Sequence, residues 1–465
     1  MKKKKLILIN PVNNVKKGFL LKENKNRNMY QPLALGIVAA LTPDNWEVEI
    51  LDEVFIPFEY KEADLVGFTA FTSSVLRAYE IAKIYKEKGI PTVLGGIHAS
   101  MLPDEALNYV DSVVIGEAES VWRKLISDFE NGCLQKKYKG IHLELKNSVK
   151  PKRELFNKNY IFGSIQTSRG CPMNCDFCSV SSFNGREYRQ RPINEILDEL
   201  ETIPQKYIFF VDDNIIGYGK NSQQRAIELF KGMIKRKLKK EWFSQASLNF
   251  ADNDEVLKYA RKSGCRLILM GIESEKEEDL KEIDKKLNLK KGVENYKKIF
   301  KKIQRHGICV LGTFMYGLDN DSIEDLNKRT EFILKSGVDS IQTTILTPLP
   351  GTPLYKRAAK DNRIIKNNYP EDWGDYNFYE PVMLPKKMTY NEFQKSMNEQ
   401  WHKLYGKRNL FFRACRTAWN MRNFNPYLWA ARGVNGFLWA YTTNLSYRNM
   451  IIEEELFLKK NKMLF

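Results

Sequence analysis

Two features are missing from this 465-residue chain, and each excludes a class of protein. No run of about 18 apolar residues occurs, which argues against a transmembrane helix. The apolar stretch after the initial lysines is only Leu6 to Ile9, too short for the hydrophobic region of a signal peptide. Seven cysteines, an odd number, without a secretory signal indicate a reduced chain instead of a disulfide framework. We therefore expect a cytoplasmic protein.

Acidic residues are also missing, but only from one segment, Trp401 to Ile452, in a chain whose net charge is +17. This segment carries half of the tryptophans: Trp401, Trp419, Trp429 and Trp439. Cationic and aromatic side chains together suit a membrane interface, a nucleic-acid surface, or simply a helical cap with buried tryptophans. Of the two surface functions we favour peripheral membrane contact through residues 401–450 over nucleic acid, because residues 427–441 are mostly apolar.

Residues 1–140 alternate short apolar strands with helical patterns, which predicts a Rossmann-like, doubly wound parallel sheet in the α/β class. In such folds ligands bind beyond the carboxyl ends of the strands. Small or polar residues follow the expected strands at those ends: Asn10-Pro11, Thr69 to Thr72, Gly95 to His98, and Gly116-Glu117. Together these turns predict one ligand site, although each glycine taken alone is better explained by a tight turn than by a ligand contact.

The rest of the chain divides into three parts. Residues 141–160 are polar and basic and form the expected linker. Six strand–helix units over 161–375 predict a (β/α)6-type partial barrel, and 376–465 is mostly helical.

Three of the seven cysteines stand in the stretch RGCPMNCDFCSV: Cys171, Cys175 and Cys178. They follow the expected strand FGSIQTS and therefore lie at the catalytic face of a barrel. Thiolates at this spacing can hold an iron–sulfur cluster, and three thiolates for four irons leave one iron open. Zinc is the alternative, but it needs a distant histidine, one of His98, His142, His306 and His402.

At this loop the chain resembles the radical SAM superfamily, which shares the three-cysteine spacing and an aromatic residue at the position of Phe177. Four later stretches resemble the family's strand-end motifs in the expected order: FFVDDN, GIES, GTFMYGLDND and TPLPGTPLY. The resemblance implies a 4Fe–4S cluster on the three cysteines and S-adenosylmethionine beside it. It further implies S-adenosylmethionine contacts from the following residues: Phe177, Asp212, Asp213, Gln245, Glu273, Ser274, Gly312 and Gly317.

The residue types suit these roles, but alternatives stay open. Asp212 or Asp213 offers an anion to an ammonium group, and glycines at 312 and 317 allow close approach of a nucleoside. The aspartates could instead cap a helix, and Glu273 could belong to a buried ion pair.

Within the superfamily, residues 1–140 resemble the N-terminal cobalamin-binding domain of one group. The similar stretches are QPLALGIVAAL, GFTAFTSS, GGIHASMLPDEAL and VVIGEAE. The implied cobalamin contacts are Thr69, Gly95, Gly96, His98, Gly116 and Glu117. The D-x-H-x-x-G motif that supplies histidine to cobalt is absent, so His98 is interpreted as a loop residue near the corrin. A domain that keeps the fold but binds no corrin is the alternative.

This resemblance predicts a cobalamin-dependent radical SAM enzyme, most simply a C-methyltransferase acting on an unactivated carbon of a lipid, isoprenoid, tetrapyrrole or other natural product. An electron donor such as flavodoxin or ferredoxin is implied. Radical cyclisation or rearrangement without methyl transfer is the alternative. Methylthiotransferases and members with auxiliary clusters need more cysteines than this chain has, since Cys133 is the one cysteine before Cys171 and Cys415 the one after Cys309.

Overall fold

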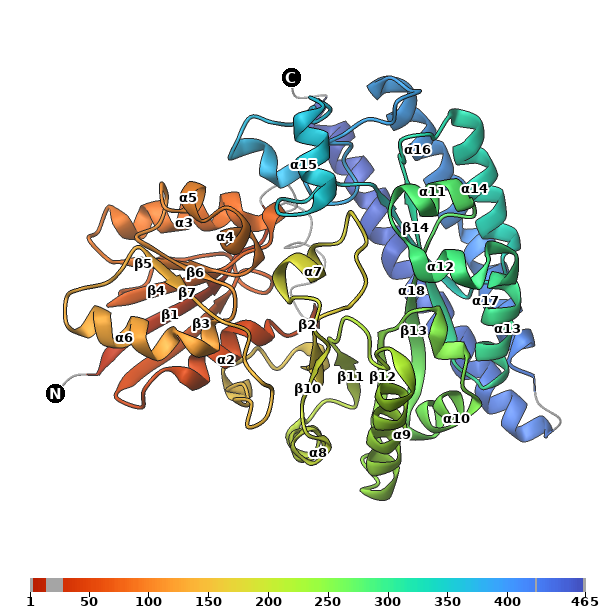
Figure 1. Ribbon diagram of the computed structural model, residues 1–465, viewed down its shortest axis with the longest axis horizontal. Helices are drawn as coiled ribbons and strands as arrows, with labels where there is room; N and C mark the ends of the chain where they lie inside the picture. The colour runs from red at the N-terminus through yellow and green to blue at the C-terminus, as the bar shows by residue number, and fades with distance from the viewer. Residues whose placement is uncertain (1–2, 14–27, 423–424, 463–465) are drawn as a thin grey trace.

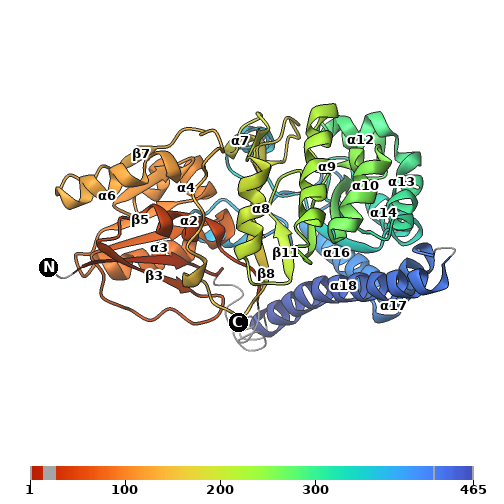
Figure 2. The ribbon, with the colours of Figure 1, turned by 90° about the horizontal axis from the view of Figure 1, so that it is seen from below.

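The computed structural model describes residues 3–13, 28–422 and 425–462. Two parallel sheets stand side by side, one in the N-terminal part and one in the middle of the chain (Figure 1). The helical C-terminal region packs against the second sheet, and its last helix runs below that sheet from its far edge to the middle of the molecule (Figure 2).

The N-terminal sheet has the strand order β3-β1-β4-β5-β6-β7, with all neighbours parallel. Its strands are β1 (Lys4–Asn10), β3 (Trp46–Asp52), β4 (Leu65–Thr69), β5 (Thr92–Gly95), β6 (Ser112–Ile115) and β7 (Lys137–Lys139). Neighbouring residues of β1 face opposite sides, and both sides are buried: Leu6 and Leu8 on one, Ile7 and Ile9 on the other. A strand buried on both faces needs helices on both faces, and this is the doubly wound arrangement expected from the sequence.

Helices on the two faces complete this layer structure. They are α2 (Leu33–Leu41), α3 (Val75–Lys86), α4 (Ile97–Met101), α5 (Pro103–Ala106) and α6 (Trp122–Glu130). Helix α3 buries Val75, Ala78, Ile81 and Ala82 against one face of the sheet, while α2 and α6 cover the other face.

The second sheet has the order β15-β14-β13-β12-β11-β8-β2, and its strands are also parallel. Its strands are β8 (Tyr160–Ile165), β11 (Tyr207–Phe210), β12 (Glu241–Gln245), β13 (Cys265–Glu273), β14 (Cys309–Tyr316), β15 (Ser340–Ile345) and β2 (Asn28–Tyr30). Six of these strands are the units expected over 161–375. Since β15 and β8 are not paired, the sheet is a partial barrel.

Strand β2 was not foreseen, and it joins the second sheet although it lies within the first 140 residues. It pairs with β8 through Asn28–Tyr160 and Tyr30–Phe162. The ring of Tyr30 lies 4.9 Å from that of Phe209, so aromatic packing on the barrel strands accounts for its position.

Long helices cover the outside of the barrel, where their apolar stripes are buried. They are α8 (Ile193–Thr202), α9 (Gly219–Lys235), α10 (Asp254–Ser263), α13 (Tyr296–Arg305) and α14 (Ile323–Lys335). Helix α14 begins with a capping box in which Ser322 and Asp325 satisfy each other's backbone N–H groups.

The expected C-terminal region, residues 376–465, is mostly helical where the structure describes it. Its helices are α16 (Tyr390–Tyr405), α17 (Lys407–Asn420) and α18 (Pro426–Lys462), and α15 (Pro353–Lys360) precedes the region. Trp401 is buried, and the Trp439 ring packs 6.1 Å from Tyr207 and 6.3 Å from Phe162 at the amino end of the barrel. Trp419 points outward. No helix in the described part of the chain combines the length and the apolar character that a bilayer crossing requires.

Candidate functional site

The three clustered cysteines lie in one loop between β9 (Ser168–Arg169) and α7 (Ser179–Phe183), beyond the carboxyl end of β8. All three are partly exposed free thiols. Cys178 immediately precedes α7, and its backbone N–H donates to the Cys175 carbonyl at 3.1 Å. The loop is therefore folded back on itself with its thiols accessible.

Two aspartates fix the chain before this loop. Asp212 Oδ1 accepts hydrogen bonds from the Thr167 backbone N–H at 2.8 Å, from the Ser168 Oγ at 2.8 Å and from the Ser168 backbone N–H. Asp213 Oδ2 accepts from the Gly170 backbone N–H at 3.2 Å and from Asn184 Nδ2 at 3.1 Å. Both carboxylates, expected from the resemblance to face S-adenosylmethionine, thus have a shared role in anchoring the cysteine loop at both ends.

Burial makes Asp212 a weaker acid than an ordinary aspartate. Its side chain is fully buried, and Oδ2 has no hydrogen-bond partner. Desolvation raises the pKa of Asp212 to about 6, although the hydrogen bonds from Ser168 and Thr167 oppose the shift. Ionising the Asp212 carboxyl group, which holds the cysteine loop, therefore costs free energy.

A partly buried lysine, which the sequence did not single out, faces the cysteine loop. Lys285 Nζ lies 2.7 Å from Glu273 Oε1 and 5.6 Å from the centre of the Phe177 ring. The loop and this segment are also joined through the backbone, since the Asp176 N–H donates to the Ile283 carbonyl at 3.2 Å. Burial alone would lower the pKa of Lys285, but Glu273, Cys175 and Cys178 outweigh burial and raise it. Lys285 is thus a fixed positive charge beside the thiols.

The environment of the thiols favours their protonated form when nothing is bound. Burial raises the pKa of Cys178 to about 12, and it also raises the pKa values of Cys171 and Cys175. The neighbouring thiols add to the effect at Cys178, whereas Lys285 acts against it. Binding of iron to these cysteines must therefore release protons.

The donor set is made of cysteine thiols, the ligands that hold the irons of an iron–sulfur cluster. Among the described residues, no three His, Cys, Asp or Glu side chains gather as the ligands of one ion would. A four-iron cluster binds each thiolate through a different iron, so its ligands stand further apart. Cys171, Cys175 and Cys178 would hold such a cluster, with Lys285 beside it.

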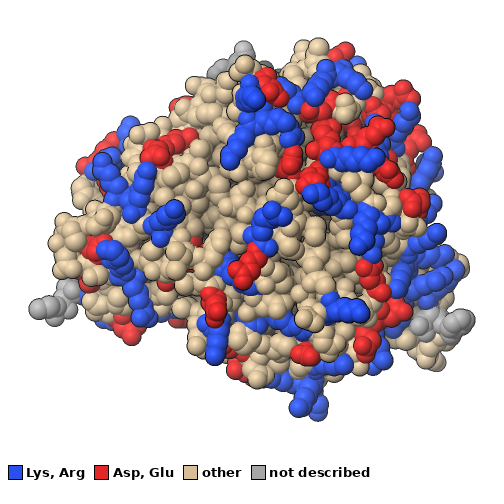
Figure 3. All heavy atoms as spheres, viewed as in Figure 1, with Lys and Arg blue, Asp and Glu red and all other residues tan. Residues whose placement is uncertain are grey.

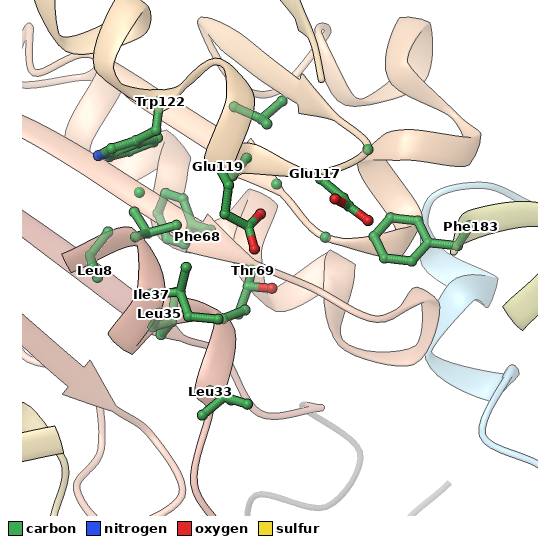
Figure 4. A pocket seen from close by; sticks show the side chains of 18 of the residues that line it. Leu8, Leu33, Leu35, Ile37, Phe68, Thr69, Glu117, Glu119, Trp122 and Phe183 are labelled. Carbon is green, nitrogen blue, oxygen red and sulfur yellow. The ribbon is translucent and has the colours of Figure 1, made fainter. Parts of the chain in front are cut away.

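Beside the cysteine loop, a cavity of about 300 Å³ opens at the carboxyl edge of the N-terminal sheet (Figure 4). Its deep end is walled by Leu8, Ile37 and Trp122, and Phe183 lies at the end facing the barrel. Gln166, Arg169 and Asn184, which flank the cysteine loop, also line it. Cavity and cysteine loop therefore share one wall.

The cavity lies where the sequence predicts the cobalamin site, beyond the carboxyl ends of the strands of the N-terminal sheet. The predicted residues Thr69, Gly95, Gly96, Gly116 and Glu117 all line it. A Cβ at Gly95 would meet no protein atom closer than 3.8 Å, so the missing side chain leaves free space in the cavity. Gly96, with φ +92°, makes the tight turn into α4.

His98 does not reach the cavity. It is fully buried on the inner side of α4, where Nδ1 lies 3.4 Å from Thr72 Oγ1 and Nε2 lies 3.3 Å from Glu105 Oε1. Its ring packs edge-on against Trp373 at 5.4 Å. The turn at Gly96 starts α4 at Ile97 and directs His98 into this interior network, so His98 does not line the cavity, and its place near the corrin stays a prediction.

Glu117 connects the two halves of the site. Its carboxylate pairs with Arg189 at 2.5 Å and with Arg169 at 3.2 Å, and it accepts from the Leu143 N–H at 3.1 Å. Arginine holds the pKa of Glu117 below its usual value despite burial. Arg169 also pairs with Glu119 at 2.5 Å, so charged pairs join the N-terminal domain to the cysteine loop.

The other residues predicted for S-adenosylmethionine are spread over different surroundings. Gln245 ends β12 and is partly exposed, whereas Ser274 is fully buried and donates to Asp279 at 2.6 Å. A Cβ at Gly312 would press on Phe314 and Val338, and one at Gly317, which has φ +83°, would strike Phe393. Internal packing thus accounts for both glycines, and Ser274 belongs to the buried network around Arg329.

Known proteins share these features. The chain matches the Radical SAM superfamily over residues 165–333 and the B12 binding domain over residues 25–126. It is 32% identical over 373 residues to bacteriochlorophyllide d C-12(1)-methyltransferase from Chlorobaculum tepidum, covering 77% of this chain and 78% of the relative. The chain belongs to the radical SAM superfamily.

Two further similarities extend this result. Hopanoid C-2 methylase from Rhodopseudomonas palustris is 27% identical over 362 residues, which cover 74% of this chain and 67% of the relative. The radical S-adenosylmethionine methyltransferase TsrM from Kitasatospora setae, solved with cobalamin and a 4Fe–4S cluster, superposes with a TM-score of 0.66 at 15% identity. The match covers 94% of this chain and 99% of that chain, and it shows the same fold.

The predicted family, fold class and enzyme class are thus confirmed. The chain is a radical SAM enzyme with a B12-binding domain, and the two domain families confirm the predicted 4Fe–4S cluster, S-adenosylmethionine and cobalamin as its cofactors. The individual residues predicted to contact S-adenosylmethionine and cobalamin stay predictions.

Proposed function

We propose that this radical SAM enzyme is a C-methyltransferase that modifies an unactivated carbon of a lipid, isoprenoid, tetrapyrrole or other natural product. The observation that carries the proposal is the shared wall: Gln166 and Arg169 before the cysteine loop and Asn184 after it line the cavity of the B12-binding domain. Two bound cofactors would therefore face a common space. When bound, they supply hydrogen abstraction and a methyl group.

The protein's own groups organise that space. Asp212 and Asp213 hold the cysteine loop. The ion pairs of Glu117 with Arg169 and Arg189 join the two domains. Lys285 places a positive charge beside the thiols. Ion pairs of this kind are most effective away from water, where their geometry is fixed. The relatives that act on a hopanoid and on a bacteriochlorophyllide support a large, apolar natural product as the substrate class.

We also propose two finer features. A flavodoxin or ferredoxin supplies the electron that the cluster needs. The enzyme is cytoplasmic and touches a membrane peripherally through residues 401–450, because the segment lacks acidic residues and exposes Trp419 and Tyr427.

The test is anaerobic turnover of the reconstituted enzyme with S-adenosylmethionine deuterated in its methyl group, a reductant, and a hopanoid or bacteriochlorophyllide as candidate substrate. Methyl transfer predicts 5′-deoxyadenosine and S-adenosylhomocysteine in equal amounts, and a product that carries the trideuterated methyl group. Formation of 5′-deoxyadenosine with an unmethylated, altered product would replace methyl transfer by cyclisation or rearrangement.

A further inference from the structure

Helix α17 and the first 25 residues of α18 form an antiparallel pair, here called the C-terminal hairpin (residues 407–450). Its inner face is bonded to the barrel. Arg416 donates to the carbonyls of Leu334 and Val338, each at 3.0 Å, and Asn444 Nδ2 donates to the Asp339 carbonyl at 2.9 Å. Because these bonds fix the hairpin, its outer face is a defined surface of the molecule.

The outer face is unusually apolar. Fifteen large hydrophobic side chains of the described residues are exposed, and seven of them lie between residues 411 and 438. These seven are Phe411, Phe412, Trp419, Tyr427, Leu428, Val434 and Leu438. On α18 the exposed positions 427, 430, 431, 434, 438 and 442 recur every three or four residues and carry no charge. One continuous helix face is therefore both exposed and uncharged.

Positive charge borders this face without any negative charge. Arg408 lies 5.6 Å from the Phe412 ring and Arg422 lies 5.2 Å from the Trp419 ring. No Asp or Glu occurs from residue 401 to 452. Elsewhere the signs mix: on the face seen in Figure 3, basic and acidic side chains are interspersed. In Figure 2 the hairpin forms an outer edge of the molecule with no other element beyond it.

We propose that the outer face of the C-terminal hairpin docks on the surface of a membrane that contains anionic lipids. This deepens, and rests on, the peripheral contact proposed for residues 401–450. The aromatic and aliphatic side chains would enter the headgroup region, and Lys407, Arg408 and Arg422 would meet lipid phosphates. The helices would lie flat, since the buried inner face prevents them from inserting. A protein partner would more often be matched by mixed charge at the rim, which this face lacks.

The experiment is flotation of the reconstituted full-length enzyme with vesicles of phosphatidylglycerol and phosphatidylcholine, compared with phosphatidylcholine alone. We expect at least tenfold stronger binding to the anionic vesicles, weakening as salt rises from 50 to 500 mM. Trp419→Ser with Leu438→Ser should reduce binding at least tenfold. Brominated lipid should quench part of the tryptophan fluorescence of the wild type, and Trp419→Phe should remove this quenching.

Ile141→Ser, which changes an exposed hydrophobic residue outside the hairpin, is the matched control and should bind like the wild type. Cleavage of S-adenosylmethionine without vesicles should be unchanged in every variant, so loss of docking is distinguishable from loss of the radical chemistry. Equal flotation of the double variant, or no flotation at all, overturns the proposal. So does a dimer that the double variant converts to a monomer, or RNA binding at physiological salt in place of vesicle binding.

Discussion

The cysteine loop and the cavity of the B12-binding domain share a wall, yet they are built by opposite means. The cavity takes its shape from apolar side chains such as Leu8, Ile37 and Trp122 and from missing side chains at Gly95 and Gly96. The loop takes its shape from charged groups that are buried (Asp212 and Glu273) or partly buried (Asp213 and Lys285). The comparison teaches that a bulky organic group is fitted by shape, whereas a small charged cluster is fitted by electrostatics.

Removing the thiols should abolish the iron–sulfur cluster and leave corrin binding unchanged. In the variant Cys171→Ala, Cys175→Ala, Cys178→Ala, we expect about four irons per chain to be lost while the corrin band stays, because the cavity does not depend on the thiols. Iron analysis and the visible spectrum after anaerobic reconstitution measure both. Cys133→Ala, which changes an exposed thiol elsewhere, should keep its iron; loss of the corrin band in the triple variant would contradict the separation.

The buried carboxylate of Asp212 should make the anchor of the loop sensitive to pH. Its pKa of about 6 in the folded protein lies above the ordinary 3.8, so the unfolded chain binds fewer protons between these values and stability falls as pH rises through this window. Two pKa units correspond to about 3 kcal/mol. Urea unfolding at pH 4.5 and pH 7 should show the stability of the wild type, relative to Asp212→Asn, falling by about 2 kcal/mol, because about 1.5 of these units lie above pH 4.5.

The exposed Asp198→Asn serves as the control for this measurement and should follow the wild type at both pH values. If Asp212→Asn has the same pH dependence as the wild type, the carboxylate is not the titrating anchor.

Filling the cavity should weaken corrin binding and leave the cluster intact. Gly95→Leu adds a side chain to the wall of the cavity without a clash at its Cβ, and we expect hydroxocobalamin to bind at least tenfold more weakly with an unchanged iron content. Titration followed in the visible spectrum gives the affinity. Ser127→Leu on the exposed side of α6 is the control. Equal affinity in Gly95→Leu would show that the corrin lies elsewhere.

Removing the positive charge beside the thiols should have the smallest effect. Lys285→Met should make the midpoint potential of the cluster more negative, because a reduced cluster gains one negative charge; about 60 mV corresponds to a tenfold change in the one-electron equilibrium. A redox titration followed by electron paramagnetic resonance measures the shift. Lys285→Arg should restore much of the potential, and Lys286→Met, one residue away and exposed, should have none of the effect.

Most strands and the cysteine loop could be predicted from the sequence, because the patterns that indicate them are local. The strands of the N-terminal domain and the six barrel strands were recognisable from short apolar runs that alternate with helical patterns, and the three cysteines lie within eight positions of one loop. Strand β2 escaped notice because three residues give no periodicity, and its pairing with β8 is fixed by tertiary packing of Tyr30.

The sequence by itself determined the cofactor chemistry, since three closely spaced thiols and the successive strand-end motifs are read directly from the order of residues. Only the tertiary structure decided which side chains contact one another around the site. Lys285 stands in a lysine-rich stretch more than 100 residues after Cys178, and only the barrel brings it to the thiols. His98 is only two residues after Gly96, yet the turn sends it into the interior. The physical reason is that side-chain direction and long-range contact depend on how the backbone is packed, which no local pattern records.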